Sequence, residues 1–77
     1  MNFLECIKRI ERLDVLIRLE NTGSPRVLSE RLNIGERQIY RLIEQMRNLG
    51  AEIEYSQCKV SYIYTKPVKL KIGYIEH

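Results

Sequence analysis

The sequence is poor in the side chains that most catalytic and metal sites use. It contains one histidine, His77, and two cysteines, Cys6 and Cys58, which lack the spacing of metal ligands. No Ser-His-Asp set, reactive-cysteine environment, phosphate-binding glycine loop or paired-carboxylate pocket can be assembled from it. We therefore expect no enzyme, no metal and no cofactor, and we assign no role to His77. Two free thiols are favoured over a disulfide.

Long apolar runs are missing as well. No stretch approaches the roughly 20 apolar residues that cross a bilayer. Residues 1–5 lack the basic start and apolar stretch of a signal peptide. We expect a cytoplasmic protein without a membrane partner. The 77 residues, 44% apolar and 30% charged, are typical of one globular domain spanning 1–77.

An excess of one charge is also nearly absent. The net charge is +3, and the first 20 residues, with four basic and four acidic groups, contribute nothing to it. All of the basic surplus therefore lies in the remainder of the chain. Such a surplus permits nucleic-acid binding without demonstrating it.

Hydrophobic periodicity predicts three helices. They span residues 3–20, 25–32 and 36–49. Asn2 is expected to cap the first helix and Ser24 the second, with Pro25 at the first helical position. Asn33 tolerates the positive φ that a sharp turn into the third helix requires.

The first helix carries a broad apolar surface. Its main stripe consists of Phe3, Cys6, Ile7, Ile10, Leu13 and Ile17. Val15, Leu16 and Leu19 lie off that stripe. Either the rest of the fold covers this end of the helix, or the helix offers a second apolar face to a partner.

After Gly50 the apolar period changes to two, which predicts three antiparallel strands. They span residues 51–55, 60–65 and 68–74. A hairpin through residues 56–59 joins the first two, and Val60, Tyr62 and Tyr64 are expected on its buried face. The predicted fold class is α+β, with three helices followed by two or three strands.

The segment from residue 28 to residue 41 has the spacing of a helix-turn-helix. Ser29 is a small residue where two helices can cross closely, and Asn33 allows the reversal between them. Ile39 is the aliphatic residue that packs the helix over residues 36–49 onto the helix over residues 25–32. In these features the chain resembles winged helix-turn-helix regulators of bacteria, notably the amino-terminal domains of DeoR-like, WYL-type and biotin-repressor-type proteins.

The resemblance extends along most of the chain. Residues 37–41 are similar to the Arg-Thr-Ile-Tyr-Arg of that group, and residues 49–50 and 62–64 match its helix end and its wing. Gly35 replaces the usual Ser or Thr cap, Gln38 replaces the usual Thr, and the usual wing glycine before Tyr62 is absent. The resemblance implies sequence-specific binding of double-stranded DNA and regulation of transcription, with the third helix in the major groove.

Seven residues are the candidates for contact with DNA. They are Ser24, Arg26, Arg37, Gln38, Tyr40, Arg41 and Lys59. Arg37 and Arg41 can donate paired hydrogen bonds to guanine or contact phosphates. Gln38 can read adenine or bond a phosphate, and Tyr40 can bond a phosphate or touch a thymine methyl group.

The other three candidates lie outside the recognition helix. Lys59, at the hairpin turn, is expected to contact an adjacent groove or the backbone. Ser24 and Arg26 are phosphate candidates because a helix start carries free N–H groups.

Each assignment has a structural alternative. Arginines at helical spacing often form only a solvated face, and Glu44 can pair within the helix with Arg41, Arg47 or Asn48. The tyrosines at 62, 64 and 74 are expected in the core rather than stacked on bases. Lys69 and Lys71 suit an exposed edge strand.

A protein–protein interaction module without DNA binding is the alternative function. The modest charge and the apolar Val15, Leu16 and Leu19 favour it. No small-molecule effector domain is expected after the wing. A homodimer through the first helix or the third strand is therefore one expected means of control.

Overall fold

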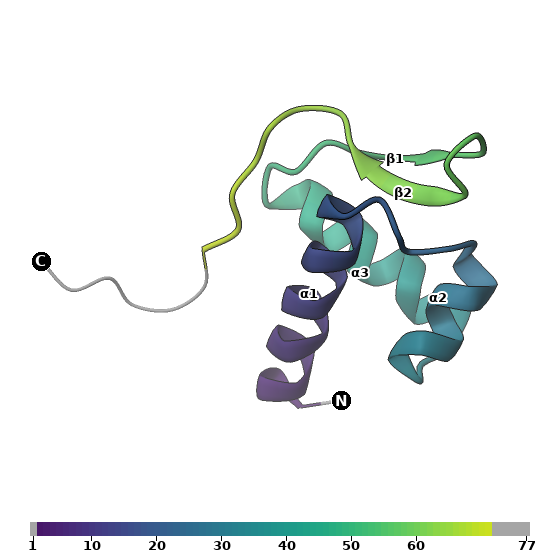
Figure 1. Ribbon diagram of the computed structural model, residues 1–77. Helices are drawn as coiled ribbons and strands as arrows, with labels where there is room; N and C mark the ends of the chain where they lie inside the picture. The colour runs from purple at the N-terminus through teal and green to yellow at the C-terminus, as the bar shows by residue number, and fades with distance from the viewer. Residues whose placement is uncertain (1, 72–77) are drawn as a thin grey trace, which may run out of the picture.

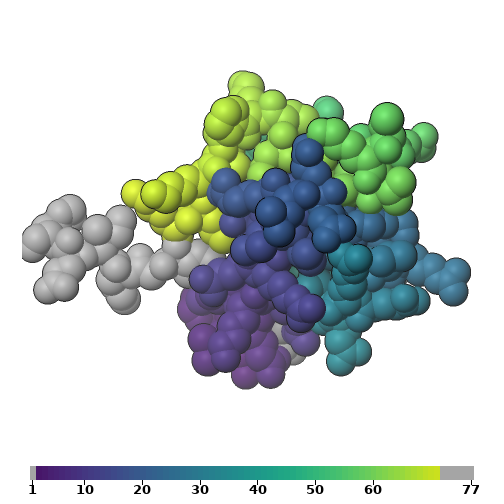
Figure 2. Space-filling model, viewed as in Figure 1, coloured from purple at the N-terminus to yellow at the C-terminus, as the bar shows by residue number. Residues whose placement is uncertain are grey.

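The computed structural model describes residues 2–71, which form three helices followed by a hairpin (Figure 1). The helices are α1 (Phe3–Arg18), α2 (Pro25–Leu32) and α3 (Glu36–Asn48), and the strands are β1 (Ile53–Ser56) and β2 (Ser61–Tyr64). The α+β layout is confirmed. In Figures 1 and 2 the hairpin lies across the carboxyl-terminal end of α1, and the segment after the hairpin runs beside α1.

The helix starts follow the capping residues predicted from the sequence. The Asn2 side chain accepts a hydrogen bond from the Glu5 N–H at 2.8 Å, and Ser24 Oγ accepts one from the Val27 N–H at 3.3 Å. Gly35 caps α3 without a side-chain hydrogen bond. All three helices therefore start where the sequence predicts.

One apolar core joins all the elements. It contains Ile10, Leu13, Ile17, Leu28, Leu32, Ile39, Leu42, Ile43, Met46, Ile53 and Tyr62. The periodic stripes of α1 and α3 thus face inward, as expected. Two apolar residues of these stripes are exceptions. Phe3 lies in the first turn of α1, beyond the core, and remains 81% exposed. Leu49, expected as the last residue of the third helix and of its apolar stripe, follows the end of α3 at Asn48 and is 77% exposed.

The three helices end in the same backbone motif, in which a left-handed residue follows the helix. These residues are Glu20, Asn33 and Gly50, with φ angles of 54°, 55° and 110°. The prediction for Asn33 is confirmed. The prediction that the first helix reaches residue 20 is wrong: α1 ends at Arg18, and Glu20 is already in the turn.

The hairpin differs from its prediction in its first strand and at the turn. The first strand begins at Ile53 rather than at residue 51 and ends at Ser56 rather than at residue 55. Ser56 pairs with Ser61, so residues 57–60 form the turn and the second strand starts one residue later than expected. Val60 is left-handed, with φ 50°, and is 53% exposed, whereas Ser61 is wholly buried. The expectation of a buried Val60 is therefore wrong.

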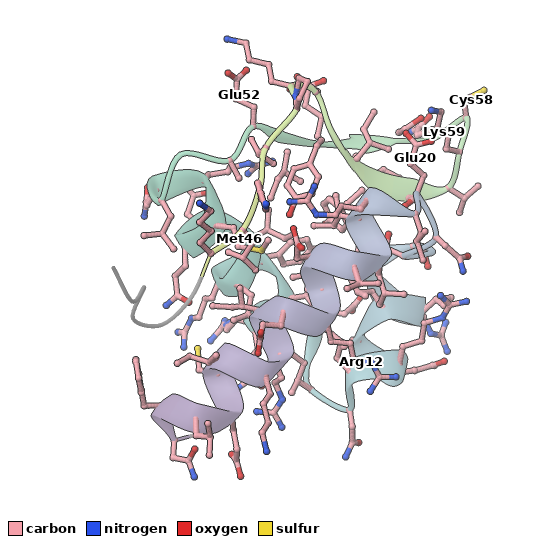
Figure 3. All side chains as sticks on the ribbon, turned by 60° about the vertical axis from the view of Figure 1, so that its left-hand side comes forward. Arg12, Glu20, Met46, Glu52, Cys58 and Lys59 are labelled. Atoms are coloured by element: carbon pink, nitrogen blue, oxygen red, sulfur yellow. The ribbon has the colours of Figure 1, made fainter. Side chains whose placement is uncertain are left out.

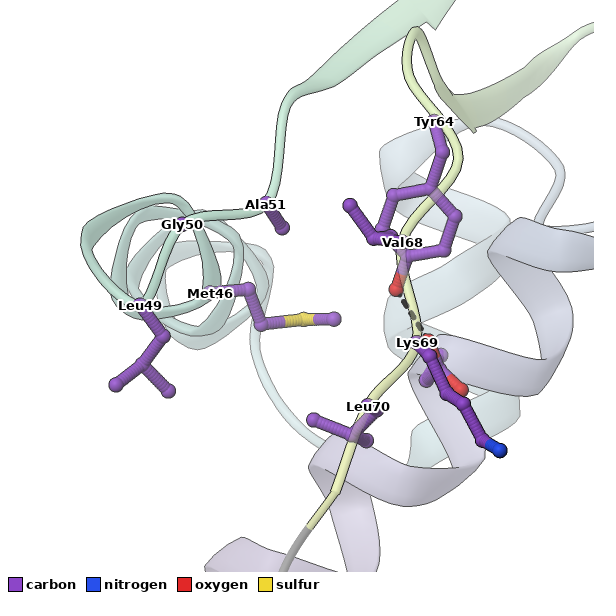
Figure 4. A pocket seen from close by; sticks show the side chains of 9 residues that line it. Met46, Leu49, Gly50, Ala51, Tyr64, Val68, Lys69 and Leu70 are labelled. Carbon is purple, nitrogen blue, oxygen red and sulfur yellow. Dashed lines mark hydrogen bonds between the residues drawn. The ribbon is translucent and has the colours of Figure 1, made fainter.

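The third predicted strand is wrong over residues 68–71, which have no regular secondary structure; residues 72–74 lie outside the described residues. Lys69 and Lys71 are exposed, while Val68 and Leu70 are half-buried. Both apolar side chains line a cavity of about 220 Å³ at the end of α3, into which the Met46 side chain points (Figure 4). Residues 68–71 thus follow the predicted alternation without a strand partner.

Candidate nucleic-acid interface

The face of α3 that lies opposite the core is polar and exposed. It consists of Arg37, Tyr40, Arg41, Glu44 and Asn48. The buried residues Ile39, Leu42, Ile43 and Met46 hold the other side of the helix against the core. The helix is therefore fixed with this polar face toward solvent.

Arg37 and Arg41 are the available cations of this face. They lie one helical turn apart and so project on the same side of α3. Within residues 2–71, neither guanidinium group has a carboxylate oxygen within 4.0 Å. Two adjacent guanidinium groups can thus approach an external anion without first breaking an ion pair.

Arg47, in contrast, has a structural role. Its guanidinium donates hydrogen bonds to the Ile53 carbonyl oxygen at 2.8 and 3.2 Å, and it pairs with Glu44 at 3.4 Å. The side chain therefore ties the last turn of α3 to the start of β1. The predicted intrahelical pair of Glu44 is formed with Arg47.

The side of α3 nearest the hairpin carries an aromatic and an acidic residue. Burial raises the pKa of the Tyr62 phenol, and the nearby Tyr40 raises it further. Glu36 also lies close enough to raise that pKa. Tyr40 itself is 54% exposed and belongs to the open face of α3.

The candidates at the helix starts differ in accessibility. Ser24 is half-buried and its hydroxyl caps α2. Arg26 is exposed, with Glu30 as a distant ion-pair partner at 4.0 Å. Gln38 is half-buried in the first turn of α3.

Lys59 lies in the hairpin turn, as predicted, but it is not an unpaired cation. Its Nζ donates to both carboxylate oxygens of Glu20, at 2.9 and 2.8 Å. This contact joins the turn to the loop between α1 and α2. Nothing in the local sequence signals it, because the two residues are 39 positions apart.

Two buried hydroxyl groups fix the hairpin against the same loop. The Thr22 N–H donates to Ser61 Oγ at 3.0 Å, and the Tyr62 N–H donates to Thr22 Oγ1 at 2.9 Å. Thr22 and Ser61 are both wholly buried. Since buried polar groups need partners, these bonds hold β2 at a defined distance from the α1–α2 loop.

Other kinds of site find little support in the part of the chain that the structure describes. No three His, Cys, Asp or Glu side chains among residues 2–71 are grouped so that they could hold a metal ion. Cys6 and Cys58 are free thiols. None of the helices within residues 2–71 is long and apolar enough to span a membrane.

Comparison with protein-family models, with curated proteins and with solved structures found no match to this chain.

Proposed function

We propose that the chain is a winged helix-turn-helix domain that binds double-stranded DNA, with α3 in the major groove and the hairpin on the backbone or an adjacent groove. The observation that carries the proposal is the outward face of α3, with exposed Arg37 and Arg41 that have no acidic partner within residues 2–71. Base edges are read mainly from the amino-terminal half of such a helix, where both arginines lie.

The geometry around α3 supports this proposal. The left-handed Asn33 separates α2 from α3, and the buried Ile39 packs α3 onto the core. A hairpin follows α3, and Arg47 anchors its first strand through the Ile53 carbonyl. Helix, turn, helix and hairpin thus occur in the order that a winged helix requires.

The experiment is a salt titration of binding to random and to selected DNA duplexes, measured by fluorescence anisotropy. Contact with phosphates predicts that log K falls linearly with log salt concentration, by about 0.9 for each phosphate contacted. Arg41→Ala should weaken binding, whereas Lys8→Ala, which removes an exposed positive charge from α1, should have a smaller effect.

A protein-interaction module is the second candidate, because α1 carries exposed apolar side chains outside the core. Leu4 and Val15 in α1, and Leu19 directly after it, are more than half exposed, whereas Leu16 packs against the core. A second copy of this chain is one partner for that surface. Absence of binding to either duplex at micromolar protein and low salt would favour this candidate, and light scattering would report the oligomeric state.

A further inference from the structure

The ion pair between Lys59 and Glu20 occupies the tip of the hairpin. Both carboxylate oxygens of Glu20 accept from the Lys59 ammonium group, at 2.8 and 2.9 Å. Figure 3 shows the two side chains converging beside Cys58. Both remain accessible, with about half of the Lys59 side chain and 42% of the Glu20 side chain exposed. A solvent-borne anion can therefore reach the same ammonium group.

Glu20 stands at a backbone position that disfavours glutamate. The Glu20 N–H donates to the Ile17 carbonyl and the Asn21 N–H to the Leu16 carbonyl, both at 3.0 Å, with Glu20 left-handed between them. This arrangement is the Schellman motif, whose left-handed position favours glycine or asparagine. A carboxylate near a helix carboxyl terminus is also unfavourable electrostatically.

The ends of α2 and α3 show that Glu20 is unusual at this position. The same pair of hydrogen bonds encloses Asn33 after α2 and Gly50 after α3. Both residue types adopt the left-handed conformation readily. Only at α1, among these three helix ends, does a charged side chain occupy the position. Backbone preference does not explain Glu20, whereas its side-chain contact with Lys59 does.

The fold holds the two charges together. Thr22, two residues after Glu20, is bonded to Ser61, two residues after Lys59. Because both hydroxyl groups are buried, the segments that carry Glu20 and Lys59 are fixed side by side. The ion pair therefore does not depend on the chance meeting of two flexible side chains.

We propose that Glu20 occupies the position of a DNA phosphate and holds Lys59 until a backbone phosphate replaces the carboxylate. The inference rests on the proposed DNA binding. A lysine–phosphate contact carries no sequence information, so an unpaired Lys59 would strengthen binding to every duplex. By competing for Lys59, Glu20 weakens binding to random DNA and leaves discrimination to the face of α3.

The test compares Glu20→Gln with Glu52→Gln. Glu52 pairs with Lys66 at 3.0 Å near the opposite end of the hairpin, so the control removes the same charge from a similar exposed pair (Figure 3). Glu20→Gln should tighten binding to random duplex about two- to fivefold, the range expected for release from a surface ion pair. Its salt slope should steepen by up to about one, because the variant has no carboxylate that takes up a cation when the phosphate displaces it from Lys59. Glu52→Gln should change both quantities less.

A second background separates release of Lys59 from simple removal of repulsion. In a Lys59→Ala protein, adding Glu20→Gln should increase the affinity for random duplex by no more than Glu52→Gln does in the parent protein. The inference would be overturned if Glu20→Gln increased the affinity as much in the Lys59→Ala protein as in the parent protein. It would also be overturned if Glu52→Gln increased the affinity as much as Glu20→Gln. Thermal unfolding of each variant verifies that the fold is retained.

The outcome for the parent protein distinguishes the two proposals. If the parent chain binds duplex DNA and Glu20→Gln binds no more tightly, the inference alone fails. If no variant binds any duplex at low salt, DNA binding itself is excluded, and the inference fails with it.

Discussion

The Tyr64 hydroxyl at the end of β2 donates a hydrogen bond to the Asp14 carboxylate of α1, fifty residues earlier in the chain (Figure 4). Arg18 donates to the other carboxylate oxygen at 2.9 Å, and its guanidinium carbon lies 5.3 Å from the centre of the Tyr64 ring. Asp14 is buried beside the core. Because both carboxylate oxygens have a partner, the cost of burying the charge is offset.

This contact predicts a dependence of stability on alkaline pH. Burial raises the pKa of Tyr64 above the ordinary 10.0, and the hydrogen bond to Asp14 raises it further. Above pH 10 the unfolded chain therefore releases a proton that the folded chain retains, so the free energy of unfolding should decrease as pH rises. Urea unfolding between about pH 8 and about pH 11 measures this slope.

The matching variant is Tyr64→Phe. At neutral pH the free energy of unfolding of this variant should be about 1.5–3 kcal/mol lower than that of the parent, which is the contribution of a hydrogen bond to a charged group. Above pH 10 the difference from the parent should narrow, because the variant lacks the titrating phenol. Ile43→Val, which destabilises a buried site by about 0.5–1.5 kcal/mol without removing a phenol, should keep the full alkaline slope. Parallel pH profiles for the parent and Tyr64→Phe would contradict the prediction.

The buried hydroxyl pair predicts a second stability effect. Thr22→Val keeps the shape of the side chain but removes the oxygen that accepts from the Tyr62 N–H and donates to the Gly23 carbonyl at 2.8 Å. Buried groups left without a partner cost about 1–3 kcal/mol. We expect urea unfolding to show that Thr22→Val lowers the free energy of unfolding by an amount in that range.

Thr65→Val is the matched control for this loss. Thr65 is exposed, and its hydroxyl lies 3.4 Å from the carbonyl oxygen of Glu52. Its removal should change the free energy of unfolding by less than about 0.5 kcal/mol. If the two variants lose equal stability, the hydroxyl pair does not hold the hairpin.

The left-handed backbone of Val60 predicts a substitution that stabilises the protein. A β-branched residue in this conformation is strained by roughly 1–2 kcal/mol, whereas asparagine tolerates it. Val60→Asn should therefore raise the free energy of unfolding by about 1 kcal/mol. Val15→Asn is the control, because Val15 is similarly exposed, at 52%, but lies in α1 with a helical backbone. A gain that appears equally in both variants would not come from the backbone of Val60.

The sequence predicts those parts of the fold that depend on neighbouring residues. Asn2, Ser24 and Asn33 act within three residues of their own position, so each cap or turn could be recognised locally. The apolar period likewise identifies the buried side of α3. The outward position of Arg37 and Arg41 follows from that side directly.

Contacts between distant segments have no such signal. The pairs Glu20–Lys59 and Asp14–Tyr64 join segments 39 and fifty residues apart. The left-handed position of Glu20 has no local signal either, because the residues that favour a helix end, Asn21 to Gly23, lie beyond the point where α1 ends. Strict alternation failed at Val60 for a similar reason, since the turn takes one residue that the pattern assigns to the strand.

The proposed division of roles between α3 and the hairpin predicts different effects for Arg37→Ala and Lys59→Ala. If Arg37 reads a base edge, its loss should weaken binding to the selected duplex by about 1–3 kcal/mol and to random duplex by less. Lys59→Ala should weaken binding to both duplexes by the same factor, with a salt slope shallower by at most about one. Lys8→Ala reports the effect of removing one positive charge from α1. If Arg37→Ala weakens binding to both duplexes by the same factor, Arg37 contacts a phosphate rather than a base. If Arg37→Ala and Lys59→Ala weaken binding no more than Lys8→Ala does, neither the outward face of α3 nor the hairpin turn contacts the DNA.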